Sequence, residues 1–331
     1  MKILVTGGCG FIGSNFIKLL FHTFHDKSNM SDSLLGKFPK SVSKKGLEVM
    51  NIDCLTYAGN TENVAEVMGL PGYEFSNTDI RDSTSVSKIF ERFQPEYVVH
   101  FAAESHVDRS IDSGNIFVET NVLGTQILLE CARETGVKRF LHVSTDEVYG
   151  STISGSFSEV DILNPSSPYA ASKASSDLMA KSHHNTYSTP VVITRCTNNY
   201  GLNQHTEKLL PKVITFAKEG KSIPIYGDGK NVRDWLHVLD HCSAILLLLE
   251  RGENGEIYNI AAQEERNNLE VVSSIFSFLE IEERIHFVED RAGHDWRYSL
   301  DDSKIRSLGW EPLIDFDSGI KQSVLHYEVK G

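Results

Sequence analysis

The sequence predicts an α/β protein with a doubly wound parallel sheet and a smaller C-terminal lobe. The chain begins with a short apolar run, Lys2 to Thr6, a glycine-rich turn, and a helical pattern from Ser14 to about Phe24. Further apolar runs alternate with helical patterns as far as Arg195, and such alternation is typical of parallel sheets. From Cys196 the segments become short and turns are frequent, which indicates the second lobe.

Composition limits the classes of function. The chain has 331 residues, a formal net charge of −13 and 40% hydrophobic residues, enough for one large or two ordinary domains. The acidic balance argues against nucleic acid, whose binding depends on neutralising phosphates. The longest apolar stretch, Ala244 to Leu249, is far shorter than the roughly 20 residues of a membrane span. Five scattered cysteines and the lack of a signal-peptide pattern predict a cytoplasmic protein with reduced thiols and no metal.

The glycine-rich turn predicts a dinucleotide site. The turn, GGCGFIG at 7–13, follows the first predicted strand and opens the first helix, the context in which a glycine motif is informative. Gly8, Gly10 and Gly13 fit the spacing GxGxxG, and Gly7, Gly10 and Gly13 fit GxxGxxG. Glycine lets the backbone approach a pyrophosphate at the helix N-terminus. The first domain is therefore expected to be Rossmann-like.

The second predicted strand, Leu47 to Ile52, ends at Asp53. A carboxylate at this place accepts hydrogen bonds from both adenosine ribose hydroxyls and favours NAD over NADP. Asp53 follows Gly13 by 40 positions, whereas about 20 is usual. The excess is interpreted as a surface insertion at about 26–46, without a chemical role.

The remaining pattern sets the domain boundaries. Further strands are predicted at Glu74–Ser76, Tyr97–Phe101, Phe140–Val143 and Val191–Arg195, and helices at Asn115–Glu134 and Tyr169–Tyr187. Residues 1–195 form the NAD-binding domain in this interpretation, and residues 196–331 form the smaller substrate-binding lobe. The segment 235–262 is expected to return to the sheet.

One stretch combines several reactive groups. The predicted strand at Phe140–Val143 is followed by Thr145, Asp146 and Glu147, and a later helix carries Tyr169 and Lys173 four positions apart. Residues four apart share one face of a helix, and open α/β sheets bind ligands at the carboxyl ends of their strands. A hydroxyl, two carboxyl groups, a phenol and an ammonium are therefore expected to converge there.

At this point the chain resembles the extended short-chain dehydrogenase/reductases and, within them, the nucleotide-diphosphoglucose 4,6-dehydratases. The resemblance covers nearly the whole chain outside the insertion. The matching motifs include AAESHVDRS at 102–110, STDEVYG at 144–150, SPYAASK at 167–173, NNYG at 198–201, EKLLP at 207–211, RDWLHV at 233–238 and RAGHDWRYSLD at 291–301. The pair Asp146-Glu147 after Thr145, with SHVDRS and GHDxRY, is much more specific than YxxxK, which occurs across the superfamily. One departure is GLNQHTEK at 201–208, where the family usually has GPxxxPEK, so the hexose or base preference is left open.

The resemblance implies roles by position. The catalytic residues would be Thr145, Asp146, Glu147, Tyr169 and Lys173. NAD would be bound by Gly7, Gly10, Phe11, Ile12, Gly13, Asp53, Asp79, Ile80, Phe101, Ala102, Ala103, Thr120, Tyr169 and Lys173. The nucleotide-sugar would contact Ser105, Asn198, Asn199, Glu207, Lys208, Leu209, Tyr226, Arg233, Asn268, Arg291, His294 and Tyr298. The resemblance also implies a homodimer that pairs the helices at about 115–134 and 169–187.

The implied reaction converts a nucleotide-diphosphoglucose, such as dTDP- or UDP-glucose, to a 4-keto-6-deoxy sugar for rhamnose-type deoxysugar synthesis. Tyr169, with Thr145 on the same oxygen, takes the 4-hydroxyl proton while NAD accepts the C4 hydride, which later returns to C6. Glu147 then removes the C5 proton and Asp146 protonates the departing 6-hydroxyl. An ammonium about 6 Å away would lower the pKa of Tyr169 by about two, and the oxidised nicotinamide adds a further positive charge.

Three alternatives are open. A nucleotide-sugar 4-epimerase of the same superfamily needs Thr145, Tyr169 and Lys173 but not the carboxyl pair. A UDP-glucuronate decarboxylase needs a basic contact for the substrate carboxylate. From another class, a non-catalytic NAD-binding sensor would tolerate the loss of Tyr169 or Lys173.

Overall fold

The computed structural model describes residues 1–24, 33–38, 46–290 and 293–329, and it confirms the predicted fold class. Seven parallel strands form one sheet in the order β10-β6-β5-β4-β1-β2-β3. Their bounds are β1 Lys2–Thr6, β2 Glu48–Asp53, β3 Tyr73–Asn77, β4 Tyr97–His100, β5 Arg139–Thr145, β6 Val191–Cys196 and β10 Ile257–Ile260. The strand order reverses direction between β1 and β4, which is where doubly wound sheets bind their ligands.

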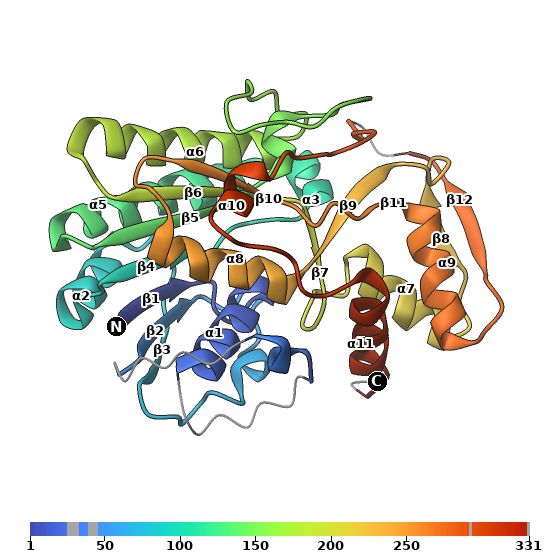
Figure 1. Ribbon diagram of the computed structural model, residues 1–331, viewed down its shortest axis with the longest axis horizontal. Helices are drawn as coiled ribbons and strands as arrows, with labels where there is room; N and C mark the ends of the chain where they lie inside the picture. The colour runs from blue at the N-terminus through green and yellow to red at the C-terminus, as the bar shows by residue number, and fades with distance from the viewer. Residues whose placement is uncertain (25–32, 39–45, 291–292, 330–331) are drawn as a thin grey trace.

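Helices cover both faces of this sheet (Figure 1). The helices on one face are α1 Phe11–Phe24 and α8 Val238–Arg251, and those on the other are α2 Ser83–Phe93, α5 Thr125–Thr135 and α6 Pro168–Tyr187. Successive residues of β1 show why both faces are apolar: Ile3 and Val5 pack with α1 and α8, whereas Leu4 packs with α2 and α5. The segment 235–262 contributes β10 to the sheet, next to β6.

The helix expected at Asn115–Glu134 is interrupted. It consists of α4 Asn115–Phe117, a π-helical turn η3 Val118–Gly124, and α5. Two short helices lie near it in the chain, α3 Val107–Asp112 and the 3₁₀ turn η4 Asp146–Tyr149, which directly follows β5. The α1 helix begins three residues before the predicted Ser14.

The smaller lobe has its own apolar core (Figure 1). Its helices are α7 Leu209–Lys218, α9 Asn268–Leu279 and α11 Phe316–Val329. The short helix α10 Ser303–Ser307 instead packs on the first domain, because Ile305 is buried in the core that α1 and α8 share. A three-stranded sheet joins β11 Glu265–Asn267, β9 Val232–His237 and β7 Asn198–Tyr200, and a two-stranded sheet joins β12 Ile285–Val288 and β8 Ile223–Tyr226. Leu210, Ile275 and Ile320 from the three long helices are all buried together.

The described part of the insertion is attached to the first domain. The 3₁₀ turn η1 Ser33–Lys37 lies within it, and the similar turn η2 Thr61–Val64 follows β2. Leu35 and Phe38 are buried in the core that α1 and α8 share, so this part of the insertion is not purely a surface segment. The rest of 26–46 lies outside the described residues. Among the described helices, none is both long and apolar enough to cross a membrane.

Candidate active site

A pocket runs along the carboxyl ends of the central strands. Its lining includes Gly7 after β1, Asp53 at the end of β2, Phe101 after β4, Thr145 at the end of β5 and Cys196 at the end of β6. All the residues predicted to bind the cofactor and all those predicted to be catalytic line this one pocket. The sheet topology therefore brings together groups that are far apart in the sequence.

The glycine turn has no room for side chains. Gly7 has a φ of +68°, and a Cβ there would lie 2.8 Å from the backbone of Ala102. A Cβ on Gly13 would lie 2.3 Å from the carbonyl oxygen of Gly7. The turn thus closes tightly, with the Gly10 amide donating to the Gly7 carbonyl at 3.1 Å, and α1 starts immediately after it. This arrangement fits a dinucleotide pyrophosphate at a helix N-terminus.

Asp53 joins the glycine turn to the second strand. Its carboxylate accepts hydrogen bonds from the Cys9 amide at 2.9 Å and the Leu55 amide at 2.8 Å. Burial nevertheless raises its pKa, because the two amide bonds only partly offset desolvation. Asp79, also in the lining, holds the Arg81 guanidinium through two oxygens at 2.6–3.0 Å. Acceptor groups therefore lie at the outer end of the pocket, as a ribose site requires.

The end of β5 places two carboxyl groups in different environments. The Thr145 hydroxyl accepts from the Glu147 amide at 3.3 Å and donates to Asp146 Oδ1 at 3.1 Å. The side chain of Asp146 is buried, whereas Glu147 is only partly buried. Burial, and then the neighbouring Glu147, raise the pKa of Asp146 well above its usual value, although Arg233 acts in the opposite direction. Asp146 is therefore suited to hold a proton at neutral pH.

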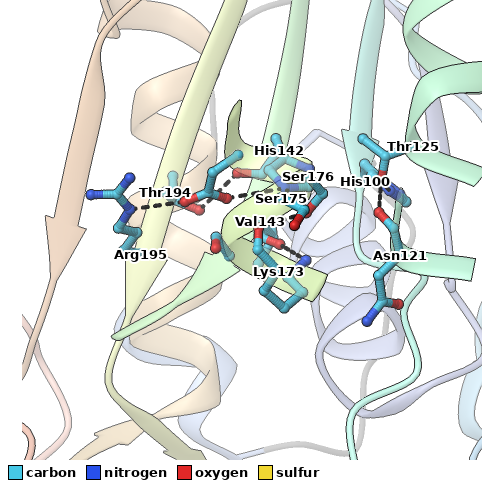
Figure 2. A network of polar contacts seen from close by, with 12 residues as sticks. His100, Asn121, Thr125, His142, Val143, Lys173, Ser175, Ser176, Thr194 and Arg195 are labelled. Carbon is cyan, nitrogen blue, oxygen red and sulfur yellow. Dashed lines mark hydrogen bonds and ion pairs between the residues drawn. The ribbon is translucent and has the colours of Figure 1, made fainter. Parts of the chain in front are cut away.

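Tyr169 and Lys173 reach the same strand end from α6. Ser167 caps this helix by accepting from the Ala170 amide at 3.1 Å, and Pro168 occupies its first turn. The Lys173 ammonium donates to the Val143 carbonyl at 2.7 Å (Figure 2). Burial lowers the pKa of Lys173 to about 8. The predicted juxtaposition of Thr145, Tyr169 and Lys173 is thus present.

The expected lowering of the Tyr169 pKa is wrong for the chain by itself. Burial raises the pKa of Tyr169 well above 10, Glu147 adds to the increase, and a hydrogen bond from Thr145 opposes it. The estimate from the sequence counted the Lys173 charge but not the cost of removing the phenolate from water. The chain alone therefore keeps Tyr169 protonated.

Four of the predicted substrate residues line the pocket: Ser105, Asn198, Asn199 and Lys208. Lys208 donates from its ammonium to the Ser105 carbonyl at 3.0 Å. Glu207 instead lies beside the pocket. Its carboxylate contacts the Arg109 guanidinium and lies 3.5 Å from the Nε2 atom of His106. This contact connects the loop at 201–208 with α3 of the first domain.

Arg233 and Tyr298 form a buried pair close to the carboxyl groups. The Arg233 guanidinium lies 4.2 Å from the centre of the Tyr298 ring and donates to the Asp295 carbonyl at 2.9 Å. Arg233 is 5% exposed, so it is not a solvated surface charge. The charge of Glu147 contributes to the raised pKa of Tyr298, after burial, so the pair is within electrostatic range of the carboxyl groups, although neither residue lines the pocket.

The other predicted substrate residues do not line the pocket in the part of the chain that the structure describes. Leu209 begins α7, Asn268 begins α9, and Tyr226 is 40% exposed at the end of β8. The His294 ring contacts Asp290 at 2.6 Å. Arg291 lies outside the described residues.

Several pocket residues were not predicted. The lining also contains Cys196, Thr197, Gln204 and His205.

Asn121 was not predicted either. It is buried in η3, donates to the Glu104 carbonyl at 3.0 Å and to Ser172 Oγ at 2.8 Å, and accepts from the Glu104 amide at 2.8 Å. Asn121 thereby holds the pocket wall after β4 against α6. A polar residue on the buried face of a predicted helix was the available signal.

Comparisons with known proteins agree with this geometry. Residues 37–323 match the family model for GDP-mannose 4,6 dehydratase. A dTDP-glucose 4,6-dehydratase of Haemophilus influenzae is 45% identical over 99% of this chain and 98% of its own length. The solved dTDP-glucose 4,6-dehydratase DesIV of Streptomyces venezuelae, with NAD bound, is 47% identical with a TM-score of 0.91, covering 99% of this chain and 97% of that one. A solved UDP-glucose 4-epimerase of Thermus thermophilus, in complex with NAD, is 29% identical with a TM-score of 0.85 and 99% coverage of each chain.

Proposed function

Since this chain belongs to the GDP-mannose 4,6-dehydratase family, we propose that it is an NAD-dependent dTDP-glucose 4,6-dehydratase, a hydro-lyase that forms the 4-keto-6-deoxy sugar. The main support is the position of the buried Asp146, whose pKa is raised, beside the more exposed Glu147 at one strand end, in the same pocket as Tyr169 and Lys173. A dehydration needs an acid and a base at neighbouring carbons, and two carboxyl groups in unlike environments can supply both.

NAD fits the residues that line the pocket. The tight turn at Gly7–Gly13, which has no room for a side chain at Gly7 or Gly13, would face the pyrophosphate, and Asp53 would accept from the ribose hydroxyls. When bound, NAD supplies the acceptor for the C4 hydride and later the donor for C6. Its oxidised ring also carries a positive charge, which counters the effect of burial on Tyr169.

The chain's own residues handle the protons. Tyr169, held by its hydrogen bond with Thr145, receives the proton of the 4-hydroxyl. Glu147 removes the C5 proton, which is acidic once C4 is a ketone. Asp146 donates its proton to the departing 6-hydroxyl, in keeping with its raised pKa.

We assign the nucleotide and diphosphate to the smaller lobe, residues 196–331 without the return segment 235–262. Arg233 and Lys208 are the cations nearest to this role, because Lys208 lines the pocket and Arg233 acts on Asp146. The similar proteins described above are named for dTDP-glucose, which favours dTDP-glucose over UDP-glucose as the substrate. A panel of nucleotide-diphosphoglucoses, compared by kcat/KM, tests the base and the effect of the GLNQHTEK loop.

The alternatives predict other products. An epimerase would leave the substrate mass unchanged, a decarboxylase would remove carbon dioxide, and a sensor would form no product. The dehydratase proposal predicts loss of one water from dTDP-glucose, which mass spectrometry measures directly. It also predicts no net accumulation of reduced nicotinamide, because the reaction is redox-neutral.

Two variants separate the carboxyl groups. Glu147→Gln should abolish exchange of the C5 hydrogen with solvent deuterium while C4 oxidation continues. Asp146→Asn should slow water loss, but should have much less effect on a 6-fluoro substrate, because fluoride leaves without a proton. Equal slowing of both substrates would contradict the role of Asp146. If both variants dehydrate dTDP-glucose at normal rates, the assignment of the elimination acid and base to these two carboxyl groups fails.

We also propose a cytoplasmic homodimer. All five cysteines are unpaired thiols, in keeping with a reducing compartment. Exposed apolar side chains gather on η3 and α6, namely Val118 and Leu123 on the first and Leu178 on the second, at 51–63% exposure. These are the two helices that the family resemblance assigns to the dimer.

A further inference from the structure

A third functional group follows Tyr169 and Lys173 along α6. Asp177 lies four residues after Lys173, so the three side chains succeed one another on one face of the helix. Lys173 is 4% exposed and Asp177 is 1% exposed. Nothing in the proposed reaction uses Asp177, although burying a carboxylate is costly unless it has partners.

Asp177 lies inside a buried polar network, and Figure 2 labels its neighbours His142, Ser176 and Arg195. Arg195 on β6 donates from Nε to Asp177 Oδ2 at 2.9 Å, and His142 on β5 places Nε2 3.3 Å from Asp177 Oδ1. The His142 ring also contacts Ser176 Oγ at 3.0 Å, and Arg195 donates to the Tyr149 hydroxyl at 2.8 Å. The carboxylate is therefore fixed in direction from two strands.

The charges around Lys173 can be followed element by element. His100 on β4 and His142 on β5 are neutral, because burial lowers the pKa of each. Cys196 on β6 is a neutral thiol, since burial raises its pKa to about 12. Burial raises the pKa of Asp146 well above its usual value, and it raises that of Tyr169, which is a neutral phenol before substrate binds. Arg195 adds a second cation, and the half-buried Glu147 lines the pocket.

Asp177 is thus the buried anion available to two buried cations. Burial raises the pKa of Asp177, but His142 and Arg195 lower it by more, so the net pKa is below its usual value and the carboxylate stays charged. The attraction of Asp177 is the largest effect that opposes desolvation of Lys173. The Lys173 ammonium donates a hydrogen bond to the Val143 carbonyl, but this carbonyl carries no net charge.

We propose that Asp177, oriented by His142 and Arg195, is a positioning residue that holds the buried Lys173 side chain in its ammonium form. The proposal rests on the proposed role of Lys173 in the reaction. Tyr169 and Lys173 can share one proton in two ways, as phenolate with ammonium or as phenol with amine. Because Asp177 lies nearer to Lys173 than to Tyr169 along the helix, it favours the first arrangement, which is the one that can accept the 4-hydroxyl proton.

The direct test is the titration of Lys173 in the Asp177→Asn variant. NMR of lysine labelled at Cε, with the signal assigned from Lys173→Gln, should show the pKa of Lys173 lowered by about one or more. The single-turnover rate of C4 oxidation should fall about tenfold or more at its pH plateau. An unchanged pKa of Lys173 would overturn the proposal, whatever happens to the rate.

A double-variant comparison separates this role from damage to the fold. If Asp177 acts through Lys173, Asp177→Asn should have little further effect on C4 oxidation in the Lys173→Gln background. Additive losses would indicate a structural role only and would contradict the proposal. If Lys173→Gln itself oxidises C4 at the normal rate, the proposed catalytic role of Lys173 fails, while the NMR result still decides the charge relation.

Controls guard against instability. Asp240→Asn is matched, because Asp240 is fully buried and bonds the Leu313 and Ile314 amides at 2.8 and 3.1 Å; it should destabilise the fold and leave the pKa of Lys173 unchanged. If Asp177→Asn does not fold, the variant carrying both Asp177→Asn and Arg195→Gln removes the whole ion pair, which is better tolerated than removing one partner. The same lowered pKa of Lys173 is expected in it, and a normal value would contradict the proposal.

Discussion

Identical carboxyl groups behave differently in this site because of their neighbours. Asp146 and Asp177 are both buried, yet the pKa of Asp146 is raised by burial and by Glu147. The pKa of Asp177 is lowered, because hydrogen bonding from His142 and the charge of Arg195 outweigh its desolvation. One residue can therefore donate a proton at neutral pH and the other can balance a cation. Residue identity alone does not settle either role.

The first prediction at this scale concerns Tyr169. Tyr169→Phe removes the group that receives the 4-hydroxyl proton, and loss of one general base costs about 10²–10⁴-fold in rate. We expect kcat to fall by this amount with little change in the dissociation constant of the nucleotide-sugar, measured by calorimetry. Tyr187→Phe, at the exposed end of the same helix, is the matched control and should retain normal activity. Near-normal turnover by Tyr169→Phe would require another base.

The second concerns Arg233. Arg233→Gln should raise KM for the nucleotide-sugar by the loss of a charge-assisted hydrogen bond, roughly 1.5–3 kcal/mol or about ten- to hundredfold. Arg233 also donates to the Val232 and Asp295 carbonyls, so the substitution can destabilise the fold. The thermal unfolding of the Arg233→Gln variant must therefore be measured in parallel. Arg297→Gln offers a control, since the guanidinium of this arginine is paired with the Glu265 carboxylate at 2.6 Å. A lower Tm with an unchanged KM would restrict Arg233 to a structural role.

At the scale of elements, the periodicity of the sequence predicted the type and order of the strands and helices better than irregularities within them. Every predicted strand of the large sheet is present, with ends shifted by at most two residues. The π-helical turn at Val118–Gly124 could not be predicted, because its causes are tertiary. A Cβ on Gly124 would lie 2.6 Å from Ile80 Cδ1, and the Asn121 side chain is held by Glu104 and Ser172.

The candidate site divides in the same way. Groups that follow a strand directly, such as Thr145 and Asp53, could be predicted, because parallel strands share one carboxyl edge. Spacing along one helix predicted Tyr169 with Lys173 and could have added Asp177. His142 and Arg195 lie within strands, where a polar residue gives no signal of its partner on a neighbouring strand. The loops of the smaller lobe have no period, so Tyr226 and Asn268 were placed by resemblance alone.

The prediction at this scale concerns the proposed dimer interface, in which η3 and α6 of one protomer pair with those of its partner. Leu178→Glu would place a charge in the proposed interface and should convert the dimer to a monomer, measured by sedimentation velocity. Leu325→Glu is a matched control, because Leu325 is similarly exposed at 53% on α11 in the other lobe. A dimer that persists in Leu178→Glu, or a monomeric parent protein, would contradict the proposed interface.

For the whole molecule, the free energy of unfolding depends on pH through four buried histidines. Burial lowers the pKa of His100 and His142 beneath the pocket, and that of His237 and His241 to about 3. A folded pKa below the unfolded value of about 6.5 means that the unfolded chain binds the proton first as pH falls. Each such histidine therefore reduces the free energy of unfolding below about pH 6.5.

His237 offers the cleanest measurement of this effect. Its Nδ1 atom accepts from the Leu239 amide at 3.3 Å and so caps α8, while Nε2 contacts the side-chain oxygen Oε1 of Gln322 at 3.2 Å. Protonation of Nδ1 would remove the cap.

The variant His237→Asn keeps a preferred capping residue and removes the titrating group. We expect it to be less stable than the parent near pH 7.5, through lost packing. The parent should then lose about 1.4 kcal/mol more than the variant for each pH unit below about 6. Urea unfolding at pH 7.5, 6 and 5 measures both curves, and effects of the buried carboxyl groups Asp234 and Asp240 cancel in the difference. Parallel curves would show that His237 is already protonated in the folded chain or that it titrates normally.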